Sequence, residues 1–165
     1  MSDARPVIRA AGVGDVATIL AFIHELAEYE RLAHEVQATR EDIERALAGD
    51  PPAVECLIAE ADAGPVGFAL FFHNFSTFTG KRGLYLEDLF VRPEWRGRGI
   101  GRQLLARLAR IAVERDCARF DWAVLAWNTP AIGFYESIGA HQMTDWRTTR
   151  LSGEALRALA AEAAD

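Results

Sequence analysis

Apolar residues recur at helical spacing in two long stretches of the chain. The first stretch opens at Gly14-Asp15, continues through AFIHELAEYERLA, and places apolar side chains at Ile19, Phe22, Ile23, Leu26 and Tyr29. The second stretch runs from Gly101 to about Arg115 and carries a stripe of Leu104, Leu105, Leu108, Ile111 and Ala112. Apolar residues three and four positions apart lie on one side of a helix. Both stretches therefore predict amphipathic helices.

Capping signals predict two shorter helices. Thr39 and the T-R-E-D run that it opens supply an N-cap and acidic first-turn residues, and the Gly-Asp-Pro-Pro run at residues 49–52 ends that helix. Residues 128–130, Asn-Thr-Pro, begin another helix, which Gly139 ends. We also expect a short alanine-rich helix near the end of the chain.

Strand candidates are apolar runs bounded by turn residues. In chain order they are PVIRA near residue 7, VECLIAEAD, PVGFALFFHNF, LYLEDLFV, ARFDWAVLA and, at residues 140–151, AHQMTDWRTTRL. Some follow one another directly, as in hairpins, and others are separated by helices, as in β-α-β units. This order predicts an α/β sandwich with a mixed sheet.

Composition and charge narrow the class of protein. The chain has 165 residues, which fits a single domain over residues 1–165. Its formal net charge of −6 argues against nucleic acid and anionic membranes as partners, because clustered lysines and arginines drive such binding; it is compatible with a cationic substrate. The stretch MSDARPVIRA lacks the apolar segment of a signal peptide, and no run reaches membrane-spanning length, so we expect a cytoplasmic protein.

Cysteines and histidines do not suggest a metal site. Cys56 and Cys117 lie far apart inside apolar segments and form no CxxC motif, which favours their interpretation as small buried hydrophobic residues. The four histidines show no spacing typical of metal ligands. No metal is therefore expected.

The sequence RGRGIG, residues 96–101, stands where an apolar strand meets a predicted helix. Glycines let the backbone approach a ligand, and the first turn of a helix presents unpaired N–H groups with a partial positive charge. Arg96, Arg98 and Arg102 add positive charge at this junction in a chain that is acidic overall. A solvated, flexible turn contains the same residue types, so these residues alone leave both a turn and an anion site open.

Two well-known phosphate motifs do not fit this loop. The nucleotide P-loop needs a lysine after its glycines, and none follows here. The dinucleotide fingerprint GxGxxG, started at Gly97, would need a glycine where Arg102 stands. The pattern that does fit is R-x-x-G-x-G, formed by Arg96, Gly99 and Gly101.

After an apolar strand, R-x-x-G-x-G resembles the acyl-CoA pyrophosphate loop of the GNAT N-acetyltransferase superfamily. The segment WNTPAIGFYESIGA, residues 127–140, resembles that superfamily's later N-x-x-A-x-x-F-Y segment. The resemblance is closer to the diamine acetyltransferases, the spermidine/spermine group with its thialysine-acetylating relatives, through VIRAA, ELAEYE and YLEDLFV. It implies a GNAT-type mixed, mostly antiparallel central sheet flanked by helices on both faces.

This resemblance covers about residues 6–140 and fades afterwards. In the tail only Trp146-Arg147 suggests alignment, and the preceding loop is shorter here. Any acidic substrate contact that the family supplies from that loop is in doubt, and Asp145 is the nearest candidate. Homodimers are common in the family, so we expect a homodimer.

The resemblance implies acetyl transfer from acetyl-CoA to a primary amine of a small cationic substrate, a polyamine or a lysine-like amine, by direct attack in a ternary complex. Tyr135 resembles the family's general acid, the Tyr of the F-Y pair. A phenol with a pKa near ~10 stays protonated at neutral pH and can protonate a leaving thiolate. Glu87 resembles the residue that attracts the cation and accepts its proton, directly or through water.

The resemblance also implies contacts to the cofactor and to the substrate. Backbone groups at the end of YLEDLFV pair with the pantetheine arm, the loop holds the pyrophosphate, and Asn128 supplies a second contact while it also suits a helix N-cap. The expected cofactor residues are Leu89, Phe90, Val91, Arg96, Gly97, Arg98, Gly99, Ile100, Gly101, Arg102 and Asn128. The expected substrate residues are Tyr29, Glu30, Glu87 and Asp88.

Plainer interpretations of the acidic residues remain open. Tyr29 and Glu30 also suit a solvated helix end. Glu87 and Asp88 interrupt an apolar strand, where adjacent side chains point to opposite faces, so an arginine or backbone partner is an alternative to an amine site. Asp88 is secondary in the amine site. Two other functions compete with a small-amine acetyltransferase: acetylation of a protein lysine or N-terminus, and a non-catalytic acyl-CoA-binding sensor.

Overall fold

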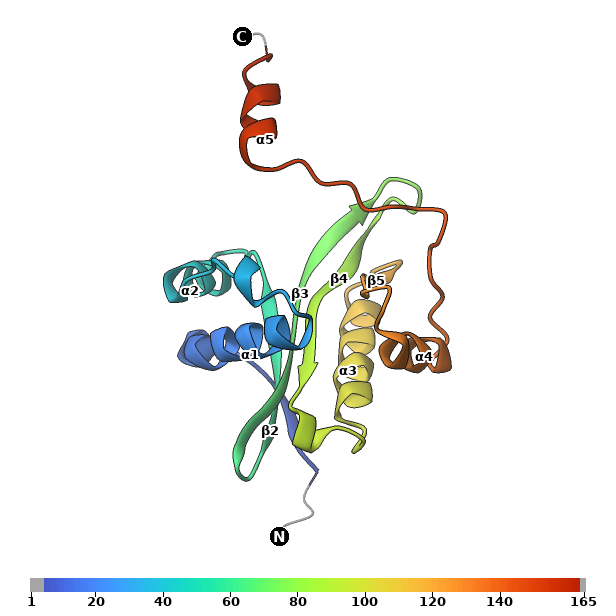
Figure 1. The fold of residues 1–165 in the computed structure, drawn as a ribbon. Helices are drawn as coiled ribbons and strands as arrows, with labels where there is room; N and C mark the ends of the chain where they lie inside the picture. Colours follow the sequence, from blue (N-terminus) through green and yellow to red (C-terminus); the bar gives the residue numbers. More distant parts are fainter. Residues whose placement is uncertain (1–4, 164–165) are drawn as a thin grey trace. The chain divides into compact units, whose positions relative to one another are not determined.

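A five-stranded sheet with the strand order β1-β2-β3-β4-β5 runs through the first part of the chain (Figure 1). In the computed structural model, which describes residues 5–163, the strands are β1 Val7–Ala10, β2 Glu55–Ala61, β3 Gly64–Ser76, β4 Lys81–Val91 and β5 Phe120–Trp122. The first four strands pair antiparallel, and β5 pairs parallel with β4. The predicted mixed, mostly antiparallel sheet is confirmed.

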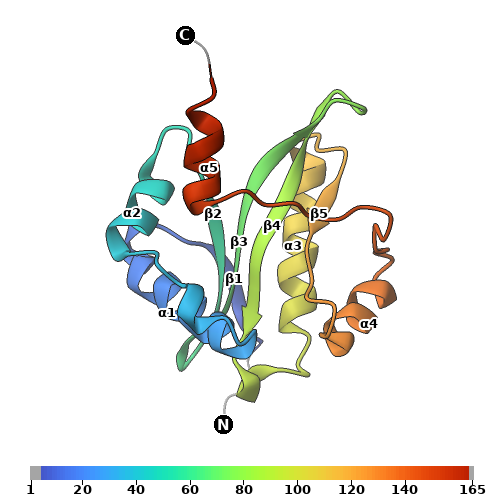
Figure 2. The same ribbon diagram turned by 45° about the horizontal axis from the view of Figure 1, so that its top comes forward.

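Helices cover both faces of this sheet. Helix α1, Val16–Tyr29, and helix α2, Arg40–Ala48, lie on one face, whereas α3, Ile100–Glu114, lies on the other (Figures 1 and 2). Short 3-10 turns at Val13–Asp15, Ala33–Glu35 and Pro93–Trp95 connect these elements. Pro93 falls two residues after the end of β4, outside the strand, as suits a residue without a backbone N–H.

The core forms where the predicted apolar stripes meet the sheet. Phe22 of α1 stacks on Phe68 of β3, with ring centroids 5.2 Å apart. Residues from α1, β2, β3 and β4 complete this side of the core: Ile19, Phe22, Leu26, Cys56, Ile58, Phe68, Leu70 and Phe90. The five stripe positions of α3 are all buried. Both predicted long helices, α1 and α3, are confirmed. Because β3 lies between the two helix layers, it is apolar on both faces.

Helix α2 begins with the predicted cap. The backbone N–H of Asp42 donates to the Thr39 hydroxyl at 3.2 Å, and the backbone N–H of Thr39 donates to the Asp42 carboxylate at 2.9 Å. This reciprocal pair satisfies backbone donors that a helix start otherwise leaves unpaired.

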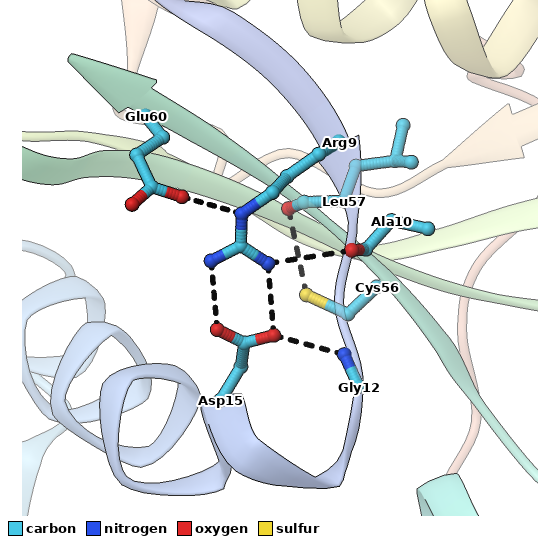
Figure 3. A network of polar contacts seen from close by, with 7 residues as sticks. All are labelled: Arg9, Ala10, Gly12, Asp15, Cys56, Leu57 and Glu60. Carbon is cyan, nitrogen blue, oxygen red and sulfur yellow. Dashed lines mark hydrogen bonds and ion pairs between the residues drawn. The ribbon is translucent and has the colours of Figure 1, made fainter.

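A charged network joins β1 to the start of α1 and to β2 (Figure 3). Arg9 donates two hydrogen bonds to the Asp15 carboxylate, at 2.9 and 2.8 Å, and a third to Glu60. The backbone N–H of Gly12 donates to Asp15 at 2.9 Å. The Arg9 hydrogen bonds hold the pKa of Asp15 below its ordinary value. The network thereby holds the edge strand β1 against both β2 and the start of α1.

The chain divides into two compact units after Leu125, and the second unit begins at Ala126. Its helices are α4, Thr129–Ser137, and α5, Gly153–Ala160. The N-cap is the predicted one, since Asn128 accepts a hydrogen bond from the backbone N–H of Ala131 at 3.4 Å. The residues 1–4, part of the stretch judged to lack a signal sequence, and 164–165 lie outside the described residues.

Two strand predictions need correction. The final strand predicted at residues 140–151 is wrong, since no strand occurs there in the described part of the second unit. Its apolar residues Met143, Trp146 and Leu151 are three and five positions apart, so Trp146 would point to the opposite strand face from the other two, and the run lacks the period of two. The strand predicted at residues 118–126 is shorter than expected, because only Phe120–Trp122 pairs with β4.

The helices also bear on membrane association. Among residues 5–163, no helix is both long enough and apolar enough to cross a membrane.

Candidate active site

Strand β4 carries a β-bulge at Glu87. Asp88 pairs with Leu70 of β3, and Leu86 pairs with Phe71, so Glu87 is the extra residue on the bulged strand. Opposed residues of an antiparallel pair point to the same face, which puts Asp88 on the α1 side of the sheet with Leu70. Glu87 is exposed and Asp88 is half-buried.

The two carboxylates therefore differ sharply in environment. Burial, and after it the negative charges of Glu87 and Glu30, together raise the pKa of Asp88 to about 7. Glu30 is the C-terminal cap of α1, and burial raises its pKa as well. A carboxyl group that is partly ionised at neutral pH, beside two further carboxylates, can attract a cation and accept a proton.

The structure thus brings three of the predicted substrate residues into one electrostatic cluster: Glu30, Glu87 and Asp88. The more perturbed of the two β4 carboxylates is Asp88, which the sequence placed second. The sequence shows the two adjacent carboxylates Glu87 and Asp88 in an apolar strand. Regular strand alternation does not reveal which of them is buried, because Glu87 is the extra residue of a bulge.

The C-terminal half of β4 has a backbone edge that no strand covers in the first unit. Strand β5 pairs with β4 only at Leu84, Tyr85 and Leu86, so among the described residues Asp88–Val91 pairs with β3 alone. An extended ligand can add to such an edge through backbone hydrogen bonds. Leu89, Phe90 and Val91 are the residues for which the sequence analysis predicted pantetheine contacts.

Positive φ angles shape the glycine loop after β4. Gly97 has φ +74° and Gly99 has φ +78°, in the left-handed region that favours glycine. Gly99 is the N-cap of α3, a 15-residue helix, and the buried Ile100 anchors its first turn in the core. The loop therefore ends in a helix start whose backbone N–H groups face outward.

Gly101 has a different reason to be glycine. It lies inside α3 with ordinary helical geometry, and a Cβ atom placed there would meet no atom within 4 Å in the described residues. The fold itself does not require a glycine at this position. A ligand that closely approaches the first turn of α3 would require one.

Two loop arginines lie over aromatic rings. The Arg96 guanidinium carbon is 4.7 Å from the centroid of the Tyr29 ring and 5.4 Å from that of Phe90. Arg98 lies 4.7 Å from the centroid of the Trp95 ring. Together with the helix start, these charges make the junction suitable for an anion such as a pyrophosphate.

An arginine that the sequence analysis did not single out holds α1 against the end of β4. Arg92 donates two hydrogen bonds to Glu25, at 3.1 and 2.8 Å, and one to the Pro65 carbonyl at 3.0 Å. Its guanidinium also lies 4.9 Å from the centroid of the Phe22 ring. The only available signal was a cation directly after a strand, which is too common to identify such a clamp.

The remaining predicted residues lie in the second unit. Tyr135 is on α4, and its ring centroid is 5.5 Å from that of Phe134. Asn128 caps the same helix. The helix-cap interpretation of Asn128 is confirmed by its side-chain oxygen, which accepts the hydrogen bond from Ala131.

Comparison with known proteins follows the same elements. Residues 19–140 match the sequence profile of the acetyltransferase (GNAT) family. The chain belongs to the acetyltransferase (GNAT) family. It is an N-acetyltransferase, and the predicted resemblance to the thialysine and diamine group is confirmed.

Relatives match the GNAT chain over most of its length. A thialysine N-epsilon-acetyltransferase from Sus scrofa is 40% identical over 165 aligned positions, and the alignment covers 93% of this chain and 96% of the relative. An L-ornithine N5-acetyltransferase from Arabidopsis thaliana is 32% identical over 197 aligned positions, with 92% and 86% covered. A solved integron cassette protein from V. cholerae superposes with a TM-score of 0.77 at 30% identity, and 95% of this chain and 98% of that chain are covered.

Proposed function

We propose that this enzyme transfers an acetyl group from acetyl-CoA to a primary amine of a small cationic substrate, either a polyamine or a lysine-like amine. The observation that carries the proposal is the cluster of Glu30, Glu87 and Asp88 beside the uncovered backbone edge of β4. The relatives named above act on thialysine and L-ornithine, at amines designated Nε and N5. The concentrated negative charge of three neighbouring carboxylates matches a small cation better than it matches an extended peptide.

Acetyl-CoA would supply the activated acetyl group as a thioester. The backbone N–H groups at the start of α3, from Gly99 to Arg102, would hold its pyrophosphate, with Gly101 leaving room for close approach. Leu89, Phe90 and Val91 would hold the pantetheine arm through their backbone, and an N–H of Leu89 or Phe90 would stabilise charge that develops on the thioester oxygen. Asn128 would add a contact from the second unit.

Proton transfer would use residues of opposite character. Asp88 has the environment of a proton acceptor, because its pKa of about 7 is matched to neutral pH. The exposed Glu87 would attract the cationic amine, and it remains the alternative acceptor through water. Tyr135 would give its hydroxyl proton to the departing sulfur. The amine would attack directly, with no acetylated side chain.

We further propose that the two units belong to one domain over residues 1–165, since the family match runs from residue 19 to residue 140 and so includes the division after Leu125. A cytoplasmic location completes the proposal, together with a homodimer, which the family resemblance implies. Binding to nucleic acid, membranes or a metal has no part in it.

An acetyl-CoA-dependent thiol-release assay over a panel of amines tests this function. The panel should contain polyamines, lysine analogues, free amino acids and lysine-containing peptides. We expect release with small amines that carry a second charge or a lysine-like side chain. Release only with peptides would favour protein acetylation, and CoA binding without release on any amine would favour the sensor.

A further inference from the structure

Arg96 differs from its neighbours in the glycine loop because its side chain is held by other parts of the first unit. Its Nε donates a hydrogen bond to the Val91 carbonyl, at 2.8 Å, at the end of β4. Its guanidinium lies over Tyr29, the last residue of α1, and over Phe90 of β4. Arg96 therefore links the end of β4, five residues away, to the end of α1, 67 residues away.

The other arginine of the glycine loop with a described ring contact stays local. Arg98 lies over Trp95, three residues away, within the same connection between β4 and α3. Arg96 instead spans from the connection to α1, across 67 residues of sequence. Substituting Arg98 thus offers a matched control with the same change in charge.

Tyr29 adjoins the carboxylate cluster. It directly precedes Glu30, whose charge contributes to the raised pKa of Asp88. The contact between Arg96 and Tyr29 therefore connects the loop proposed for the pyrophosphate to the helix end proposed for the amine.

We propose that Arg96 is a positioning residue that couples acetyl-CoA binding at the glycine loop to the amine-binding end of α1. This inference rests on the proposed function. When the loop is ordered by an anion, Arg96 is ordered with it, and the ring of Tyr29 is held more firmly in place. The coupling is reciprocal by thermodynamic linkage, so a change at Tyr29 must alter CoA affinity through Arg96.

The test is a double-mutant cycle on the equilibrium affinity for CoA, measured by isothermal titration calorimetry in the absence of amine. The variants are Tyr29→Leu and Tyr29→Phe, each in the wild-type, Arg96→Met and Arg98→Met backgrounds. A cation over an exposed aromatic ring is worth about a twofold to fivefold change in an equilibrium constant. We expect Tyr29→Leu to weaken CoA binding by about that factor in the wild-type and Arg98→Met backgrounds.

Two results distinguish coupling from simple packing. The effect of Tyr29→Leu should vanish in the Arg96→Met background, and Tyr29→Phe, which keeps the ring, should weaken CoA binding less than Tyr29→Leu does. An equal effect of Tyr29→Leu in all backgrounds would overturn the coupling while leaving the proposed function intact. A wild-type protein that does not bind CoA would overturn the proposed function itself.

Discussion

At the scale of single residues, the proton chemistry of the first unit depends on where β4 bulges. The bulge at Glu87 places Asp88 on the α1 side of the sheet, where burial and the charge of Glu30 raise its pKa. Without the bulge, Leu86 and Asp88 would share a face, since alternate residues of a strand do so. One extra residue thus decides which carboxylate is shielded from water.

Asp88→Asn should lower kcat/KM by roughly 10²–10³-fold if Asp88 accepts the amine proton. An acceptor must be ionised, so the wild-type kcat/KM should rise with pH through an inflection near the Asp88 pKa of about 7. The measurement is a pH–rate profile of kcat/KM for the amine, in which Asp88→Asn should lack this inflection.

Glu87→Gln is the matched control for that profile. It should retain the inflection, moved to lower pH because the charge of Glu87 no longer raises the Asp88 pKa, and it should weaken the rate most at low pH, where the cationic form of the amine predominates. Loss of the inflection in Glu87→Gln, with its retention in Asp88→Asn, would assign the acceptor role to Glu87 instead. An effect of Glu87→Gln that does not vary with pH would indicate a structural role for Glu87.

Tyr135→Phe should reduce turnover by about 10²–10⁴-fold, because it removes the proton that the departing sulfur receives. The substitution keeps the ring that contacts Phe134, so the fold and the affinity for acetyl-CoA should change little. Single-turnover kinetics and calorimetric titration with acetyl-CoA measure the two quantities separately. Unchanged turnover would remove Tyr135 as the general acid.

At the scale of elements, the junction of β4 and α3 separates glycines that the fold needs from one that it does not. Gly97 and Gly99 have positive φ angles, whereas Gly101 has helical geometry and open space at its Cβ position. Substitutions at these positions can therefore distinguish folding from ligand binding.

Gly101→Ala should stabilise the protein by about 0.5–1 kcal/mol, because alanine loses less conformational freedom than glycine in a helix. It should nevertheless weaken CoA binding, since the added methyl group occupies the approach to the first turn of α3. Chemical denaturation and calorimetric titration test both effects on one variant. Gly99→Ala provides the contrast, since its positive φ predicts loss of stability as well. Unaltered CoA affinity in Gly101→Ala would contradict the loop assignment.

The network of Arg9, Asp15 and Glu60 predicts how the start of α1 depends on pH. Asp15→Asn should cost about 1–2 kcal/mol of unfolding free energy at pH 7, because hydrogen bonds to a charged partner are lost. Since the folded-state pKa of Asp15 is lowered, its stabilising contribution is present above its ordinary pKa of 3.8 and disappears as pH falls through the lower folded-state pKa.

Urea denaturation of both proteins over a range of pH tests this expectation. The difference in unfolding free energy should narrow as the solution becomes acidic. Asp116→Asn, which removes the more exposed ion pair with Lys81, is the control and should change stability by less than about 0.5 kcal/mol. A constant difference between wild type and Asp15→Asn down to acidic pH would contradict the role assigned to Asp15.

At the scale of the whole molecule, the spacing of apolar residues predicted most of the helices and strands. It did not predict which apolar runs pair with a neighbouring strand. The stripes through Phe22 and Leu108 identified α1 and α3, since burial against a sheet imposes a helical period. The strand predicted at residues 140–151 was wrong because its apolar residues lack the period of a strand. A strand forms only where it can pair with a neighbouring strand, and the local composition of one segment does not show whether such a strand is available.

The candidate site shows the same division. The roles of Tyr135, Asn128 and the glycine loop were predicted from local motifs that resemble the GNAT family, and the N-cap role of Asn128 is confirmed by its hydrogen bond. The burial of Asp88 and the contacts of Arg96 with Tyr29 depend on residues distant in sequence. Such contacts arise from packing of α1 against β4, which one sequence does not specify at atomic detail.

The most direct test of the central claim is mass spectrometry of the products formed from isotopically labelled acetyl-CoA. The purified enzyme would receive a mixture of polyamines, lysine analogues and a lysine-containing peptide, with Tyr135→Phe as the control for uncatalysed transfer. We predict that the label appears on a primary amine of a small cation and depends on Tyr135. Label confined to the peptide, or small-amine labelling that Tyr135→Phe matches, would contradict the account.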